Sequence, residues 1–136
     1  MGASDPIGLD TGLFVRLLEG DAEVRELFER LLDPEVRVVV SCLTLYELRK
    51  LRHRGVIERT SADRLLEQIT SAFEIVRIDD LDMLDRAAGL SHGQDLSMAD
   101  AIILACCLGR SCEVFYTTDA DFAVYESEDL EVVVLE

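Results

Sequence analysis

The sequence lacks the features that mark zinc-binding, secreted and membrane-spanning proteins. Its four cysteines form no Cys-x-x-Cys pair and have no neighbouring histidine at metal-ligand spacing, which argues against structural zinc. The longest apolar run, residues 101–108, has eight residues, whereas a membrane-spanning helix needs about 20. No basic region followed by an apolar stretch opens the chain. We therefore expect a cytoplasmic protein that does not enter a membrane.

Positive charge is also scarce. Twelve arginines and one lysine stand against 28 acidic residues, for a formal net charge of −15. This balance opposes non-specific binding of nucleic acids, which depends on cations that neutralise phosphates. However, residues 49–64 hold six basic and two acidic side chains, a local net charge of +4, which leaves −19 for the remaining residues. This segment is suited either to a polyanion or to being an ordinary solvated helical face.

The length of 136 residues fits one domain, and apolar segments alternate between strand-like and helix-like patterns. Strands are predicted at residues 7–9, 36–40, 75–78, 114–116 and 132–135, and helices at 13–18, 21–33, 45–54, 60–73, 80–90 and 98–108. Hairpin signals such as Asn-Gly are missing. The alternation therefore predicts a single α/β/α sandwich over residues 1–136, with an open, mostly parallel sheet.

Five acidic residues stand where such a sheet would gather them, at or near the carboxyl ends of strands or at a helix start. They are Asp10, Glu47, Asp100, Asp119 and Asp121. Each also has a simpler interpretation. Asp10 is suited to cap a helix, and Asp100 has capping-box spacing from Ser97. Glu47 is placed to pair with Lys50, and Asp119 and Asp121 are typical of an Asx turn.

Convergence of four of these acids would carry an electrostatic cost. Carboxylates ~5 Å apart repel by roughly 3 kcal/mol per pair at an effective dielectric near 20. Six such pairs would exceed the ~5–15 kcal/mol stability of an ordinary domain. A converged cluster would therefore require protons or cations, and hard oxygen ligands select Mg²⁺ or Mn²⁺.

Four short motifs make the chain resemble the PIN-domain nucleases, especially the VapC-type toxins of toxin–antitoxin pairs. The motifs are Leu-Asp-Thr near the amino terminus, Thr-Leu-Tyr-Glu-Leu about 35 residues later, Ser-Met-Ala-Asp-Ala before an apolar helix, and Thr-Thr-Asp-Ala-Asp-Phe near the end. The resemblance covers nearly the whole chain. It implies a Mg²⁺- or Mn²⁺-dependent ribonuclease that hydrolyses RNA phosphodiester bonds as the toxin of a type II toxin–antitoxin system.

The resemblance also implies roles for individual residues. The metal ligands would be Asp10, Glu47, Asp100 and Asp119, with Asp121 as a further catalytic residue and Thr11 and Thr118 as supporting hydroxyls. The implied partners are RNA, a small antitoxin and a second copy of the chain. Gly12 departs from the family pattern, in which Asn is frequent, and a supporting hydrogen bond is expected to be lost there. The candidate RNA contacts from the basic segment are Arg49, Lys50, Arg52 and Arg54.

Three other functions were weighed against this interpretation. A non-catalytic PIN-like scaffold that binds proteins is favoured by the net charge of −15. A phosphoacceptor receiver domain would need a lysine after a late strand, but Lys50 is the only lysine. A dehalogenase-like phosphatase would need Asp-x-Asp after the first strand, and that spacing occurs only at Asp119 and Asp121. The nuclease and the scaffold therefore remain.

Overall fold

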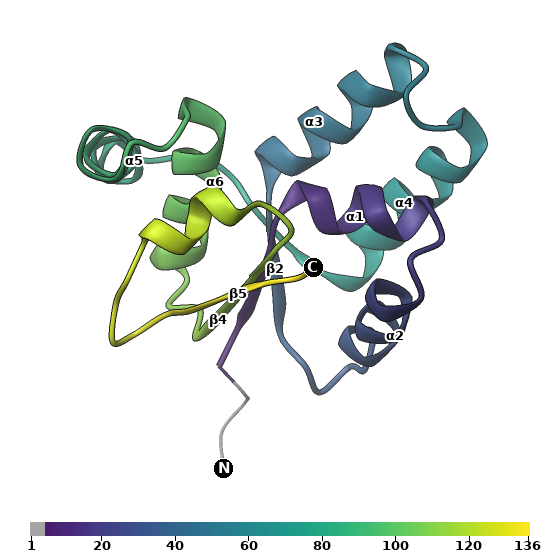
Figure 1. Ribbon diagram of the computed structural model, residues 1–136, viewed down its shortest axis with the longest axis horizontal. Helices are drawn as coiled ribbons and strands as arrows, with labels where there is room; N and C mark the ends of the chain where they lie inside the picture. Colours follow the sequence, from purple (N-terminus) through teal and green to yellow (C-terminus); the bar gives the residue numbers. More distant parts are fainter. Residues whose placement is uncertain (1–4) are drawn as a thin grey trace.

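The central sheet is parallel throughout. The structure is a computed structural model that describes residues 5–136, and Figure 1 shows the sheet between two groups of helices. Its strands are β1 (Ile7–Leu9), β2 (Val38–Ser41), β3 (Glu74–Val76), β4 (Val114–Thr117) and β5 (Glu131–Val134). The strand order is β3-β2-β1-β4-β5, and all four neighbouring pairs are parallel. The predicted α/β class is confirmed.

Pairs of helices connect the first four strands. They are α1 (Thr11–Leu18) with α2 (Ala22–Leu31), α3 (Cys42–His53) with α4 (Arg59–Ala72), and α5 (Leu81–Gln94) with α6 (Met98–Gly109). A 3₁₀ helix, η1 (Ala120–Val124), lies between β4 and β5. Within residues 5–136, no helix has both the length and the apolar content to cross a membrane.

Two apolar cores lie on opposite faces of the sheet, because side chains alternate along each strand. Val38 and Val40 belong to the core shared with α1, α2 and α4, whereas Val39 belongs to the core shared with α5 and α6. Figure 1 shows these two groups of helices on either side of the strands. A Cβ at Gly8 would lie 2.4 Å from Cys107 Sγ, so the missing side chain lets α6 approach β1 closely.

Several predicted boundaries differ from those observed. The second strand begins at Val38 rather than at residue 36, because Val36 N–H closes a turn onto the carbonyl of Asp33. The helix predicted from residue 45 begins at Cys42, where the Ser41 hydroxyl caps it. The helix predicted to end at residue 90 continues to Gln94 and ends at a left-handed residue, Asp95, with φ of 56°. Local capping explains the two helix corrections, which apolar periodicity does not detect.

The strand order reverses beside β1. The chain proceeds from β1 to β2 and β3 on one side, then returns to place β4 on the other side. Ligands of open parallel sheets bind beyond the carboxyl ends of strands at such a switch point. Asp10 directly follows β1, and Asp119 lies two residues after the end of β4. Two of the predicted acids therefore flank the expected ligand position.

Candidate metal centre

Asp10 is a buried carboxylate with both oxygens engaged. It is 5% exposed and caps the first turn of α1. Its Oδ1 accepts a hydrogen bond of 2.7 Å from the Thr11 N–H, and its Oδ2 accepts one of 2.7 Å from the Thr117 hydroxyl. Thr117 is fully buried and also accepts the N–H of Asp119 at 3.0 Å. Thr117 therefore links the acid of β1 to the backbone of the segment after β4.

Glu47 reaches the same place from α3. The Thr11 hydroxyl lies 2.5 Å from Glu47 Oε1 and 3.0 Å from the Thr44 hydroxyl. A hydroxyl carries one proton, so Thr11 donates to the carboxylate and accepts from Thr44. No ion pair joins Lys50 to Glu47 among the described residues, and the Lys50 Nζ lies 5.8 Å from the centre of the Tyr46 ring. The alternative of a simple helical ion pair is not supported.

Asp100, Asp119 and Asp121 approach from α6 and η1. Asp100 lies in the first turn of α6, and its N–H donates to the capping hydroxyl of Ser97 at 3.2 Å. Asp119 caps η1 by accepting the Asp121 N–H at 2.9 Å. Asp100 and Asp119 are half-buried and Asp121 is exposed. The Ser97 hydroxyl and the Asp119 carboxylate therefore cap the helices that they precede.

The carboxylates influence one another electrostatically. The pKa of Asp10 is raised to about 6, mainly by burial and to a smaller extent by the charges of Asp100 and Glu47, against the lowering effect of the hydrogen bonds from Thr117 and Thr11. Burial also raises the pKa of Asp100, followed by the charge of Asp119 and smaller effects of Glu47 and Asp121. Charges must be near one another to act in this way. The fold thus brings all five predicted acids into one neighbourhood.

Basic side chains do not compensate this negative charge in the part of the chain that is described. The ion pairs there join Arg37 and Arg110 to Glu74, and Arg52 to Asp63. Across residues 5–136, no three His, Cys, Asp or Glu side chains stand close enough together to enclose an ion. The atoms near the switch point that could bind a metal are carboxylate and hydroxyl oxygens. In its chemistry this donor set fits Mg²⁺ or Mn²⁺.

Thr117 and Thr44 were missed by the sequence analysis. Strand alternation offered a signal for Thr117, since it shares the buried side of β4 with Phe115 and a buried hydroxyl requires a partner. Thr118, the predicted supporting hydroxyl, lies instead over α1, where a Cβ at Gly12 would be 2.1 Å from its Oγ1. Its supporting role stays a prediction.

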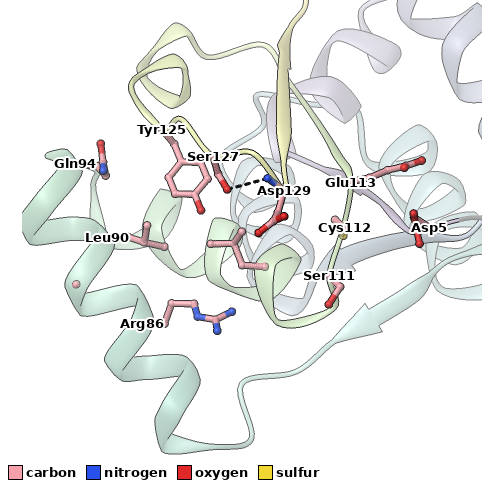
Figure 2. A pocket seen from close by; sticks show the side chains of 12 residues that line it. Asp5, Arg86, Leu90, Gln94, Ser111, Cys112, Glu113, Tyr125, Ser127 and Asp129 are labelled. Atoms are coloured by element: carbon pink, nitrogen blue, oxygen red, sulfur yellow. Dashed lines mark hydrogen bonds between the residues drawn. The ribbon is translucent and has the colours of Figure 1, made fainter.

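A large hollow lies at the edge of the sheet opposite the candidate metal centre, and none of the five acids lines it. Its volume is about 760 Å³, and it lies beside the segments that precede β1, β4 and β5. Figure 2 shows Arg86 of α5 facing Asp129 and Ser111 across this hollow. By size alone this hollow would be the candidate site, but the buried carboxylate of Asp10 lies at the other edge of the sheet.

Comparisons with known proteins agree with this fold. A family model described as the PIN domain matches residues 7–127, and the chain therefore belongs to the PIN-domain nuclease family. A comparison with curated proteins found no match.

Solved structures of similar fold include three from toxin–antitoxin systems. A toxin–antitoxin complex from Klebsiella pneumoniae is 23% identical, with a TM-score of 0.68, and the match covers 92% of this chain and 95% of that one. VapBC2 from Rickettsia felis, bound to a promoter DNA fragment, is 14% identical, with a TM-score of 0.75 and coverage of 95% and 98%. VapBC-5 from Mycobacterium tuberculosis is 23% identical, with a TM-score of 0.70 and coverage of 97% and 100%. At these identities the similarity establishes the fold.

Proposed function

We propose that this chain is a nuclease that hydrolyses RNA phosphodiester bonds with Mg²⁺ or Mn²⁺. In this proposal Asp10, Glu47, Asp100 and Asp119 hold the metal, and Asp121 is a further catalytic carboxylate. The supporting observation is the gathering of these acids at the switch point, with no ion pair to any of them among the described residues. Such a group of carboxylates attracts cations, which offset its mutual repulsion.

The chain's own residues orient this cluster before any ion arrives. Thr11 and Thr117 fix both oxygens of Asp10, and Thr11 also fixes one oxygen of Glu47. With a pKa of about 6, Asp10 is mostly ionised at neutral pH and available as an oxygen ligand. When bound, the metal supplies positive charge to the phosphate oxygens and lowers the pKa of water at the scissile bond. The proposal requires no histidine, and His53 and His92 are both exposed.

The test is cleavage of a panel of structured RNAs by the purified protein with Mg²⁺ or Mn²⁺, with and without chelator. We expect metal-dependent cleavage that Asp100→Asn abolishes. The matched control is Asp95→Asn, because Asp95 is exposed, lies between α5 and α6 five residues before Asp100, and has a left-handed backbone that Asn also adopts. Absence of cleavage with either metal, together with unchanged metal binding in Asp100→Asn, would exclude the nuclease.

A non-catalytic scaffold is the second candidate. It is favoured by the net charge of −15 and by the absence, within residues 5–136, of three metal-binding side chains at enclosing distance. Isothermal titration with Mn²⁺ separates the two candidates. A nuclease requires binding that Asp10→Asn removes, whereas a scaffold needs no metal binding.

The biological role follows from the same proposal. We expect a toxin that acts on RNA in the cytoplasm, is inhibited by a small antitoxin and forms a dimer. Support comes from the structural neighbours, which include toxin–antitoxin complexes. Co-expression with the product of a short adjacent reading frame should suppress cleavage and yield a stable complex. A mass measurement of the free protein should give two copies. Cleavage that no neighbouring product suppresses would indicate a nuclease outside such a system.

A further inference from the structure

The carboxyl end of α6 carries two cysteines that its terminal turn brings together. The Cys112 N–H donates to the carbonyl of Cys107 at 3.1 Å, and the Ser111 N–H donates to the carbonyl of Leu108 at 3.0 Å. Ser111 is left-handed, with φ of 58°. These features define a Schellman motif, in which the side chains at the positions of Cys107 and Cys112 frequently touch. The backbone therefore places two thiols in contact.

The neighbouring Cys106 does not belong to this pair. Its Sγ lies 3.4 Å from the Ser41 hydroxyl and 3.8 Å from the Met83 sulfur. With 3.6 residues per turn, consecutive side chains of a helix point about 100° apart. Cys107 is instead hydrogen-bonded to Cys112, and this bond, followed by burial, raises the pKa of the Cys107 thiol. The contact that the backbone predicts is therefore made by the side chains as well.

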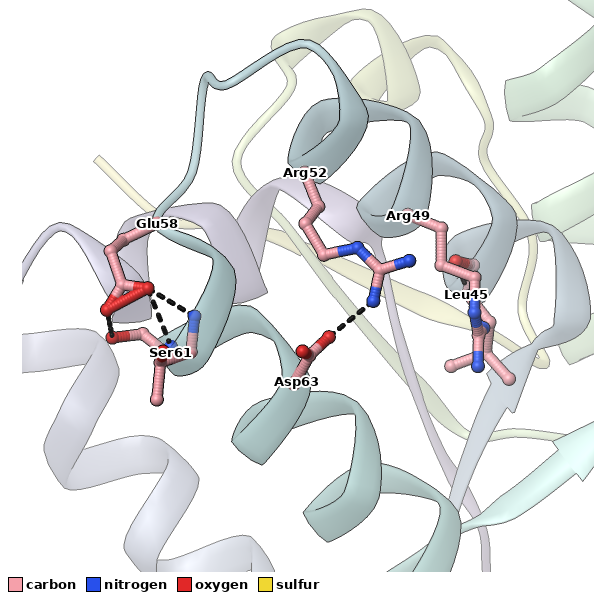
Figure 3. Close-up of polar contacts among 7 residues, drawn as sticks. Leu45, Arg49, Arg52, Glu58, Ser61 and Asp63 are labelled. Carbon is pink, nitrogen blue, oxygen red and sulfur yellow. Dashed lines mark hydrogen bonds and ion pairs between the residues drawn. The ribbon is translucent and has the colours of Figure 1, made fainter.

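Elsewhere the elements of this fold are joined by ion pairs. Arg52 of α3 pairs with Asp63 of α4 (Figure 3), and Arg110 at the end of α6 pairs with Glu74 of β3. The side-chain contact between α6 and the chain that leads into β4 is made by thiols instead. A structural zinc ion takes four ligands, and in the described part of the chain no third metal-binding side chain completes a group with this pair. The chemistry open to the pair is therefore that of a dithiol.

The two thiols differ in their access to solvent. Cys112 is 3% exposed and lines the hollow of about 760 Å³, beside Ser111 and Tyr125 (Figure 2). Cys107 is fully buried, and its sulfur packs against Gly8 of β1. A small oxidant that enters the hollow therefore reaches the Cys112 sulfur first, with Cys107 in contact behind it. A reachable cysteine next to a second one that can resolve it is the usual arrangement of a redox-sensitive pair.

We propose that Cys107 and Cys112 are a modification site, at which hydrogen peroxide converts the two thiols reversibly into a disulfide. The Cys112 sulfur gives its proton to water and attacks the peroxide, so that an S–O bond forms, the O–O bond breaks and hydroxide leaves. The Cys107 sulfur then displaces the oxygen of this sulfenic acid. An S–S bond forms, the S–O bond breaks, and the second hydroxide leaves with the proton of Cys107 as water. Two electrons pass from the thiols to the peroxide, and an external dithiol reverses the reaction.

The disulfide links the end of α6 to the chain that leads into β4. It closes a loop over residues 107–112, and such a link stabilises a folded protein by restricting its unfolded chain. In a reducing compartment a bond of this kind is transient, as in redox sensors. This inference goes beyond the proposed nuclease, because the pair contains none of the five acids and its test needs neither metal nor RNA.

The experiment treats the reduced, folded protein with hydrogen peroxide in chelator, blocks the remaining thiols and maps the tryptic peptides by mass. Trypsin cleaves after Arg110, so a Cys107–Cys112 disulfide joins two separate peptides. We expect this cross-link, its loss with dithiothreitol, and a rise in Tm of about 5–10 °C. Because one of the peptides also holds Cys106, the matched control is the Cys42→Ser, Cys106→Ala double variant, which should form the same cross-link.

Two single variants test the order of attack. Cys107→Ser should leave Cys112 as a sulfenic acid that dimedone traps, whereas Cys112→Ser should leave Cys107 unmodified. Circular dichroism checks that both variants fold, and the wild-type peptide map does not depend on them. Wild-type thiols at both positions that react only after unfolding in urea would be inert core residues, and this result overturns the inference. So does a native disulfide that involves Cys42 or Cys106, or Cys112 oxidised to a sulfinic acid without any cross-link.

Discussion

The two sides of the candidate metal centre are built differently. On the side formed by β1 and α3, the Asp10 and Glu47 carboxylates accept hydrogen bonds from Thr11 and Thr117. On the side formed by α6 and η1, the contacts are local, because Asp119 Oδ1 accepts the Asp121 N–H and the Ser97 hydroxyl lies beside Asp100. The first side is held by a contact between distant elements, whereas the described contacts of the second side stay within single turns and leave its carboxylates freer to move. Adaptable carboxylates opposite a fixed pair suit an ion that draws them inward.

The largest expected effect distinguishes a fixed metal ligand, Asp10, from an exposed catalytic carboxylate, Asp121. Asp10→Asn should weaken Mn²⁺ binding and RNA cleavage by more than ~100-fold, because loss of a buried ligand exceeds the 10–100-fold cost of losing a group that supports one. Asp121→Asn should cost less than about tenfold, since that side chain is exposed. Titration calorimetry and initial cleavage rates measure both. Equal losses in the two variants would remove the distinction between the sides.

The second effect concerns the stability of the metal-free protein against pH. The pKa of Asp10 rises from 3.8 to about 6 on folding, so the folded state favours the protonated acid. The stabilisation from this group is complete below about pH 4 and is lost as the pH rises through about 6. The loss amounts to at most about 3 kcal/mol at pH 7. Asp10→Asn should remove this pH dependence.

Urea unfolding in chelator at pH 5 and pH 7 provides the measurement. Wild type should lose stability between the two pH values, and the Asp10→Asn protein should lose less and exceed wild type at pH 7. Saturating Mn²⁺ should reverse that order, since the ion stabilises only the protein that binds it. If wild type and Asp10→Asn lost the same amount of stability between pH 5 and pH 7 in chelator, the charge of Asp10 would already be compensated by other groups.

The third prediction concerns Thr117, whose hydroxyl connects the two sides of the candidate metal centre. Thr117→Val keeps the shape but removes the donor to Asp10 and the acceptor for the Asp119 N–H. We expect metal affinity to fall by about 10–100-fold and stability by about 1–3 kcal/mol. Thr118→Val is the matched comparison and should change metal affinity less than threefold. If Thr118→Val proves the more harmful, the sequence-based assignment holds and the role given to Thr117 is wrong.

The fold was predictable because its signals are local and periodic. Runs of β-branched residues such as 38–40 identified buried strands, and their alternation with helices predicted the parallel sheet that is observed. Boundaries were less predictable. The end of α5 depends on a left-handed Asp95, and the start of α3 on a single hydroxyl of Ser41. Such terminal contacts involve one or two atoms and leave no repeating pattern.

The candidate site was only partly predictable. The acids were found because carboxylates at strand ends are visible in the sequence once the sheet is expected. The hydroxyls that orient them were not, since Thr44 and Thr117 resemble ordinary helix and strand residues. Thr117 was not singled out, although strand alternation places it on the buried face of β4. Thr44 meets Thr11 only through tertiary packing, at a separation of 33 residues.

The smallest expected effect concerns the close contact between Gly12 of α1 and Thr118 of the segment after β4. Gly12, in the first turn of α1, leaves room for Thr118, whose Oγ1 would lie 2.1 Å from an added Cβ. Alanine is favoured over glycine by about 1 kcal/mol inside a helix. Gly12→Ala should therefore fail to stabilise the wild-type protein, yet stabilise Thr118→Ala by about 1 kcal/mol, because the Thr118 Cβ would lie at an ordinary contact distance of 3.5 Å.

A double-mutant cycle in chelator measures this coupling without any contribution from metal. A coupling of about 1 kcal/mol would mean that the segment before η1 packs firmly on α1. The freedom of the second side would then belong to the Asp100 and Asp121 side chains, while their backbone stays fixed. Equal stabilisation by Gly12→Ala in both backgrounds would mean that Thr118 rotates away at little cost. In that case the family's more frequent Asn should be accepted at position 12, and the backbone after β4 is itself adaptable.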